Sequence, residues 1–109
     1  SAIAAKAQAL TNLVISRTAM MGLESISPLD AHVRGGHVSV RHEEGYAIVQ
    51  ALIARGIIPD FRAPDAMRFG VSPLFVRHVD VWDAMDALDD ILRSKSWDNP
   101  AFKMRAAVT

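Results

Sequence analysis

In three segments of the chain, side chains suited to a packing face recur at helical spacing. Residues 2–23 are rich in alanine, and their larger residues recur at i, i+3, i+4 and i+7, which predicts a helix. Residues 43–55 repeat this spacing, and Gly56 stands where a left-handed helix cap is expected. A third helix is predicted to begin at Asp80, as its N-cap. The stripes comprise Leu10, Leu13, Val14, Arg17 and Met21 in the first segment, Tyr46, Val49, Leu52 and Ile53 in the second, and Val81, Met85, Leu88 and Leu92 in the third.

Between these helices the pattern changes to that of strands. Residues 37–41 alternate between apolar and polar side chains, as a half-buried strand does. Residues 57–62 and 67–71 form two more short strand-like runs. The turn Ala63-Pro64-Asp65 between them predicts an antiparallel hairpin.

The order of elements predicts one domain over residues 1–109, of class α+β with the order α-β-α-β-β-α. Its expected parts are a leading helix at 1–23, a loop at 24–36 rich in Pro, Asp and Gly, an αβ core at 37–96, and a tail at 97–109 with one more helical turn. A small antiparallel sheet of about three strands, covered by helices, is the simplest packing of these elements.

Composition and charge exclude several classes of protein. Half of the 109 residues are hydrophobic and 22% are charged, which favours a packed core over disorder. Twelve basic side chains balance twelve acidic ones, so we expect neither a nucleic-acid nor a membrane partner. The absence of cysteine excludes disulfides and thiolate sites and fits a cytoplasmic protein. No apolar run approaches the roughly 20 residues of a membrane span.

Candidate metal ligands are present but are not arranged as a metal site. His37 and His42 would point to opposite faces of a continued strand, and there is no HExxH pattern. The aspartates of the third helix have the spacing of a solvated helix face. We therefore predict no metal site. The residues considered are His32, His37, His42 and His78, and Asp80, Asp83, Asp86, Asp89 and Asp90.

Charged residues concentrate on the predicted hairpin, within residues 60–70. Arg62 and Arg68 fall on its two strands, each within a few residues of an aspartate. One interpretation is structural, with the arginines paired to Asp60 and Asp65. The other is an anion site, because a guanidinium binds a carboxylate through two parallel hydrogen bonds. The residue types alone leave both interpretations open.

Four motifs in this region match a known family. They are Asp60-Phe61-Arg62-Ala63-Pro64-Asp65, Arg68-Phe69-Gly70, Ser72-Pro73-Leu74 and Val79-Asp80-Val81-Trp82-Asp83. With them, the stretch from about Gly35 to the end of the chain closely resembles the C-terminal region of bacterial kynureninases. These are pyridoxal-phosphate enzymes of the aspartate-aminotransferase type. Pro59 and Phe75 depart from the family, in which glycine and tyrosine are more usual.

The resemblance implies both a fold and a function. It implies a C-terminal small domain that closes over the substrate, with the large cofactor-binding domain absent from this chain. The full-length enzyme would hydrolyse L-kynurenine to anthranilate and L-alanine in tryptophan breakdown. Pyridoxal phosphate would act as electron sink in that reaction. A homodimer is the implied assembly.

Motif matching also assigns site residues. It places the arginine for the substrate's α-carboxylate on Arg68, with Arg62 behind it to orient Arg68 or to pair with a neighbouring carboxylate. Lys6, Lys95 and Lys103 lie outside the family's cofactor-lysine motif. We therefore expect no catalytic or cofactor-binding residue in this segment and no activity of the chain alone. The alternatives are a stand-alone module that binds a small carboxylate and a purely structural association module.

Overall fold

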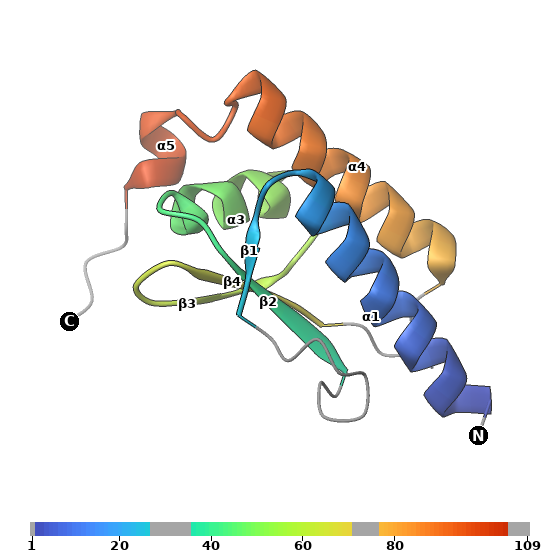
Figure 1. Cartoon of the computed structure of the whole chain (residues 1–109). Coiled ribbons are helices and arrows are strands. Elements are labelled where there is room, and N and C mark those ends of the chain that lie inside the picture. Colours follow the sequence, from blue (N-terminus) through green and yellow to red (C-terminus); the bar gives the residue numbers. More distant parts are fainter. Residues whose placement is uncertain (1, 27–35, 71–76, 105–109) are drawn as a thin grey trace.

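Antiparallel pairing of four short strands organises the chain (Figure 1). The computed structural model describes residues 2–26, 36–70 and 77–104. The helices of this part are α1 (Ala2–Met20), α3 (Gly45–Ala54), α4 (His78–Ser94) and α5 (Pro100–Lys103). Its strands are β1 (Glu24–Ser25), β2 (His37–Arg41), β3 (Asp60–Arg62) and β4 (Ala66–Gly70).

The strand order in the sheet is β1-β2-β4-β3, with every neighbouring pair antiparallel. β3 and β4 form the predicted hairpin, in which Phe61 lies opposite Met67. β4 pairs with β2 along its length, so that Val38 lies opposite Phe69 and Val40 opposite Met67. Because side chains alternate along a strand, these residues place their apolar side chains on one face of the sheet.

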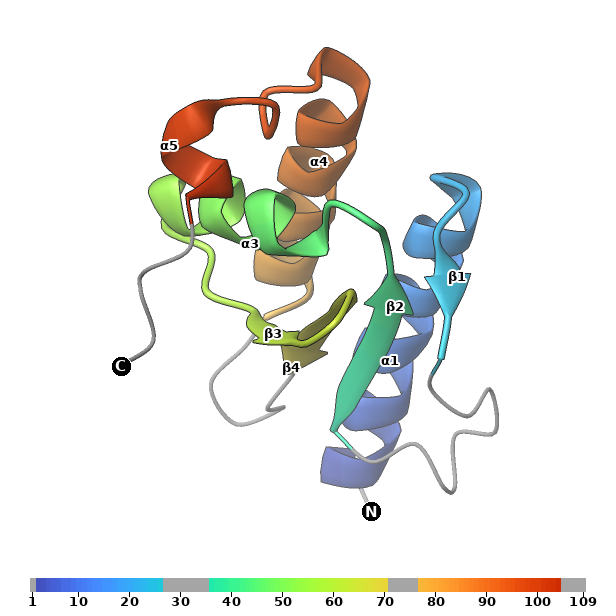
Figure 2. The same ribbon diagram turned by 90° about the vertical axis from the view of Figure 1, so that its left-hand side faces the viewer.

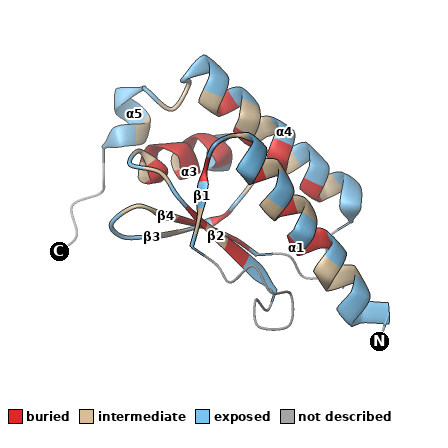
Figure 3. Ribbon diagram, viewed as in Figure 1, coloured by how far each residue is buried: buried red, intermediate tan, exposed pale blue. Residues whose placement is uncertain are grey.

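Helices α1 and α3 cover that apolar face, and no described element covers the other face (Figures 1 and 2). α4 packs against α1 and α3, and α5 packs against α3. Buried positions therefore follow the inward sides of the helices and the centre of the sheet (Figure 3). The predicted class, an α+β fold with an antiparallel sheet covered by helices, is confirmed.

The sheet has one strand more than the three that were expected. Glu24–Ser25 falls in the segment predicted as a loop, 24–36, but pairs with Val40 and Arg41 at the edge of the sheet. Two residues are too few for an alternating pattern to reveal a strand. Residues 27–35 of the predicted loop lie outside the described residues.

Two boundaries near the C-terminal half also bear on the predictions. β3 begins at Asp60 rather than at Ile57, so Pro59 precedes the paired residues. The missing backbone N–H of Pro59 therefore does not remove a hydrogen bond from the sheet. The extra helical turn expected in the tail is α5, whose N-cap is Asn99. The Asn99 side chain accepts a hydrogen bond from the backbone N–H of Ala101 at 2.9 Å.

Helices α1 and α3 end in the same way. Gly22 follows α1 with a φ of +82°, and Gly56 follows α3 with a φ of +84°, both in the left-handed region that glycine adopts without strain. Leu23 and Ile57, the next residues, donate their backbone N–H groups to carbonyls of the last helical turn at 3.0 Å. The predicted cap at Gly56 is confirmed, and the same motif ends the first helix before the predicted residue 23.

α1 buries a stripe rotated from the predicted one. Leu10 and Val14 are buried as expected, but Thr11 and Thr18 complete the buried face while Leu13 is only partly buried. Each threonine hydroxyl donates to the carbonyl four residues earlier, at 2.9 and 2.8 Å. This hydrogen bond removes the cost of burying the hydroxyl, so threonine can stand in for an apolar residue.

α3 is buried on more than one side. Val49 and Leu52 are buried as predicted, and so is Ile48, whereas the predicted Ile53 remains 40% exposed and Tyr46 is half-buried. The reason is that α3 lies between the sheet and α4, with α5 on a further side. One apolar stripe cannot describe a helix with three neighbours.

α4 follows its predicted stripe along most of its length. Val81, Met85 and Leu88 are buried, and Ile91 rather than Leu92 completes the stripe. Its start differs, because the helix begins at His78.

Asp80 is therefore the third residue of α4 and not its N-cap. Its carboxylate accepts the backbone N–H of Arg77 at 2.9 Å and the guanidinium of the same residue at 3.0 and 3.2 Å. The side-chain bond from Arg77, followed by the backbone bond, lowers the pKa of Asp80 below its ordinary value of 3.8. A carboxylate in the first turn also interacts favourably with the helix dipole.

Asp80→Asn is expected to lower the melting temperature at neutral pH and to have no effect in strong acid. A carboxyl group whose pKa is depressed in the folded state stabilises it above the ordinary pKa of 3.8. That stabilisation is lost as the pH falls through the lower folded pKa. Thermal melts across this range test the effect, with Asp83→Asn as the matched control because Asp83 is exposed on the same helix. A melting difference that stays constant with pH contradicts the assignment.

The remaining aspartates of α4 are exposed or partly exposed, in line with the predicted solvated face, but two of them also pair with arginines of other segments. Asp86 binds Arg17 of α1 at 2.6 Å, and Asp90 binds Arg55, just after α3, at 2.7 Å. Arg17 also stacks on Trp82, with its guanidinium carbon 4.5 Å from the ring centroid. The acidic face of α4 thus helps to hold α1 and α3 in place.

Candidate carboxylate-binding site

The uncovered face of the sheet carries the charged residues of β2, β3 and β4. Strand alternation places them there, because their neighbours along each strand point into the core. Arg68 of β4 lies between Ser39 of β2 and Asp60 of β3, its direct cross-strand partners. We call this surface the polar face; its residues are His37, Ser39, Arg41, Asp60, Arg62, Ala66 and Arg68.

Asp60 holds the side chain of Arg68. Nη2 of Arg68 donates a hydrogen bond to Oδ2 of Asp60 at 2.7 Å. The Arg68 side chain is 30% exposed, and its backbone is held between buried Met67 and Phe69. A short charge-assisted hydrogen bond from the adjacent strand therefore determines where the guanidinium lies.

Arg62 reaches the same carboxylate. Its Nη2 lies 3.7 Å from Oδ2 of Asp60, and both side chains are about 60% exposed. A contact so exposed contributes little stability on its own. The structure thus brings the two predicted site residues, Arg62 and Arg68, together around one aspartate.

Asp65 is engaged elsewhere. Its carboxylate accepts from Nε of Arg41 at 3.2 Å, and Nη1 of Arg41 also lies 3.4 Å from a carboxylate oxygen of Glu24. The structural interpretation, with the hairpin arginines paired to Asp60 and Asp65, is therefore correct for Asp60 and wrong for Asp65. The shared role of Asp60 was missed, although Asp60 and Arg68 lie symmetrically about Pro64 and the hairpin register pairs them.

Asp60 is the one side-chain partner of the Arg68 guanidinium among the described residues, and this contact leaves donors that a carboxylate requires. A guanidinium has five N–H groups, and Asp60 accepts one of those on Nη2. The two hydrogens of Nη2 belong to different edges of the guanidinium, one shared with Nη1 and the other with Nε. The edge that Asp60 does not use therefore keeps two parallel N–H groups. Such an edge matches the two oxygens of a carboxylate in spacing and direction.

The lysines do not fit a pyridoxal-phosphate site. The cofactor needs a lysine for covalent attachment, together with groups that bind its phosphate and ring nitrogen. Lys6 lies on α1, Lys95 is the left-handed C-cap of α4, and Lys103 of α5 pairs with Asp98 at 2.6 Å. Among the described residues, none of these three lysines belongs to the polar face that carries Arg68.

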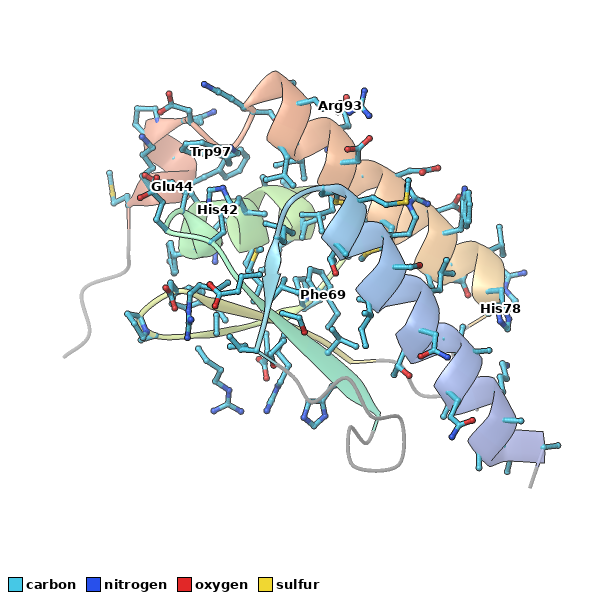
Figure 4. The ribbon with its side chains drawn as sticks, viewed as in Figure 1. His42, Glu44, Phe69, His78, Arg93 and Trp97 are labelled. Atoms are coloured by element: carbon cyan, nitrogen blue, oxygen red, sulfur yellow. The ribbon has the colours of Figure 1, made fainter. Side chains whose placement is uncertain are left out.

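His42 has a structural role at the start of α3. Its Nδ1 accepts a hydrogen bond from the backbone N–H of Glu44 at 2.9 Å. Its ring meets that of Trp97 edge-on, with centroids 6.1 Å apart, and Figure 4 shows the three residues together beside α5. This contact ties the start of α3 to the segment that leads into α5.

The other histidines do not gather around a common point. His37 lies on β2 and His78 at the first turn of α4, and His32 lies outside the described residues. Among the residues that the structure describes, no three His, Asp or Glu side chains are placed to hold a metal ion. In the same part of the chain, no helix has both the length and the apolar character to cross a membrane.

The chain is similar to known proteins over nearly all of its length. Residues 3–88 match the family model described as the kynureninase C-terminal domain. The kynureninase of Burkholderia mallei strain SAVP1 is 49% identical over 112 residues, which cover 99% of this chain and 27% of that protein. The kynureninase of Burkholderia pseudomallei strain 1106a has the same identity and coverage.

A more distant relative agrees with them. The kynureninase of Pseudomonas fluorescens is 45% identical over 108 residues, which cover 95% of this chain and 26% of that protein. The chain therefore spans about a quarter of the length of these relatives. By the family match and by these identities, the chain belongs to the kynureninase C-terminal domain family.

Proposed function

We propose that this chain supplies the substrate-carboxylate arginine of a kynureninase. In this proposal a longer protein hydrolyses L-kynurenine to anthranilate and L-alanine with pyridoxal phosphate. Membership of the family supports the reaction. The observation that carries the role of this segment is Arg68, which is oriented by Asp60 on the polar face and keeps a two-donor edge.

Arg68 binds and orients the amino-acid end of the substrate. Two parallel hydrogen bonds restrict both the position and the rotation of the α-carboxylate. With that end held, the bond to be cleaved is placed by the rigid sheet that carries Arg68. Arg62 contributes indirectly, because in the described hairpin it pairs with Asp60, the residue that orients Arg68.

The remaining parts of the enzyme belong to the longer protein. Pyridoxal phosphate supplies an electron sink for the carbanions of this reaction, and we assign its lysine and phosphate site to residues outside this chain. The rest of the longer protein is then the partner of this segment, and a cytoplasmic homodimer is the proposed assembly. The absence of cysteine agrees with that location.

The test compares the longer protein with the isolated chain. With L-kynurenine and added pyridoxal phosphate, anthranilate fluorescence should rise only for the longer protein. The isolated chain should show no stoichiometric visible absorbance from the cofactor. Borohydride reduction that attaches the cofactor to Lys6, Lys95 or Lys103 contradicts the proposal. Tight binding of L-kynurenine to the isolated chain without turnover would instead support a stand-alone carboxylate-binding module.

A further inference from the structure

We infer that Asp60 is a positioning residue for the carboxylate arginine, Arg68. The inference rests on the proposed function of Arg68. It starts from one shared atom, Oδ2 of Asp60, which lies 2.7 Å from Nη2 of Arg68 and 3.7 Å from Nη2 of Arg62. No residue of this trio is buried, so its arrangement depends on these contacts and on the strands that carry them.

The backbone places Asp60 where it can restrict Arg68. The two residues are direct partners across β3 and β4, which gives neighbouring side chains a separation of about 5 Å at their Cβ atoms. An arginine side chain has several freely rotating bonds, and ordering it costs rotamer entropy. The bond to Asp60 orders the side chain before the substrate arrives, which favours binding.

The charges of the trio also match a single carboxylate. Arg62 and Arg68 would repel each other across the hairpin without a carboxylate between them. Asp60 offsets one of the two positive charges, so the three side chains together carry a net charge of +1. A substrate carboxylate neutralises that remaining charge at the free edge of Arg68.

The test is a double-mutant cycle in the full-length holoenzyme, measured with L-kynurenine. Asp60→Asn keeps the size of the side chain but removes its charge. It should lower kcat/KM by about tenfold or more, mainly through a higher KM, because the carboxylate arginine is displaced from its productive position. In the Arg68→Ala background, the same Asp60→Asn change should alter kcat/KM by less than about twofold, since nothing remains to position.

A matched control separates positioning from hairpin stability. Asp65→Asn removes a carboxylate of the same hairpin that pairs with Arg41 and not with Arg68. It should leave kcat/KM within about twofold of wild type. If Asp65→Asn and Asp60→Asn lower kcat/KM equally, a general effect on the hairpin replaces the positioning role.

The two possible failures are distinguishable. If Arg68→Ala is impaired while Asp60→Asn matches wild type, or if the two losses are additive, the positioning role is overturned and the carboxylate role of Arg68 stands. If Arg68→Ala itself retains normal kcat/KM, the proposed function of Arg68 fails, and the inference about Asp60 falls with it.

Discussion

Arg68→Ala in the full-length enzyme is expected to lower kcat/KM for L-kynurenine by about two to three orders of magnitude. The two-donor edge of Arg68 makes two charge-assisted hydrogen bonds to the α-carboxylate, each worth about 1.5–3 kcal/mol. With partial replacement by water, the net loss is about 3–4 kcal/mol. At about 1.4 kcal/mol for each factor of ten, this gives the expected range. Steady-state kinetics of anthranilate formation measure it.

Two further variants define the role of the arginine. Arg68→Lys should recover only part of the loss, because an ammonium group cannot reproduce the planar two-pronged geometry. Arg62→Ala should have a smaller kinetic effect, since Arg62 acts through Asp60. A purely structural role for Arg68, as the partner of Asp60, predicts a lower melting temperature with near-normal kinetics. A folded Arg68→Ala enzyme within about threefold of wild type rules out the carboxylate role.

Leu88→Ala should destabilise the domain by about 3 kcal/mol, within the range of about 2–5 kcal/mol measured for buried leucines. The Leu88 side chain is fully buried in the core, on the α4 stripe that faces α1 and α3. Its truncation removes apolar contacts and leaves a cavity that the surrounding helices only partly close. For a chain of 109 residues the melting temperature should fall by roughly 10 °C or more.

Leu92→Ala is the matched control for this prediction. It is the same chemical change one turn further along α4, at a position that is only partly buried. Its cost should be clearly smaller, because less apolar surface is lost and water can enter the space that it leaves. Denaturant titrations of the two variants compare the free energies of unfolding. If the two variants lose equal free energies of unfolding, the prediction that the fully buried Leu88 contributes more than Leu92 is wrong.

Local patterns were sufficient to predict most of the elements. The three long helices, the strand at 37–41 and the hairpin about Ala63-Pro64-Asp65 all appear near their predicted positions. Each depends on residues close in sequence: an apolar repeat, an alternation or a turn-forming group. The same is true of the cap at Gly56, because the left-handed conformation is a property of one residue and its neighbours.

Errors arose where burial depends on more than one neighbouring element. Thr18 is buried on α1 because its hydroxyl bonds within the helix, whereas Ile53 remains exposed on α3. The strand Glu24–Ser25 exists only through its pairing with β2. The residue type of Asp80 favours a helix-cap position, but the helix starts two residues earlier. A hydrophobicity pattern does not contain this information.

The sequence by itself determined most of the elements, the fold class and, through its motifs, the family and the candidate Arg68. It could not determine which carboxylate each arginine binds, because Asp60 and Asp65 are both close to Arg62 and Arg68 along the chain. The tertiary structure decided this. Hairpin register sets Asp60 beside Arg68, and pairing of β2 with β4 brings Arg41 to Asp65. Ion pairs form between groups within about 4 Å, and only the assembled sheet sets such distances between strands.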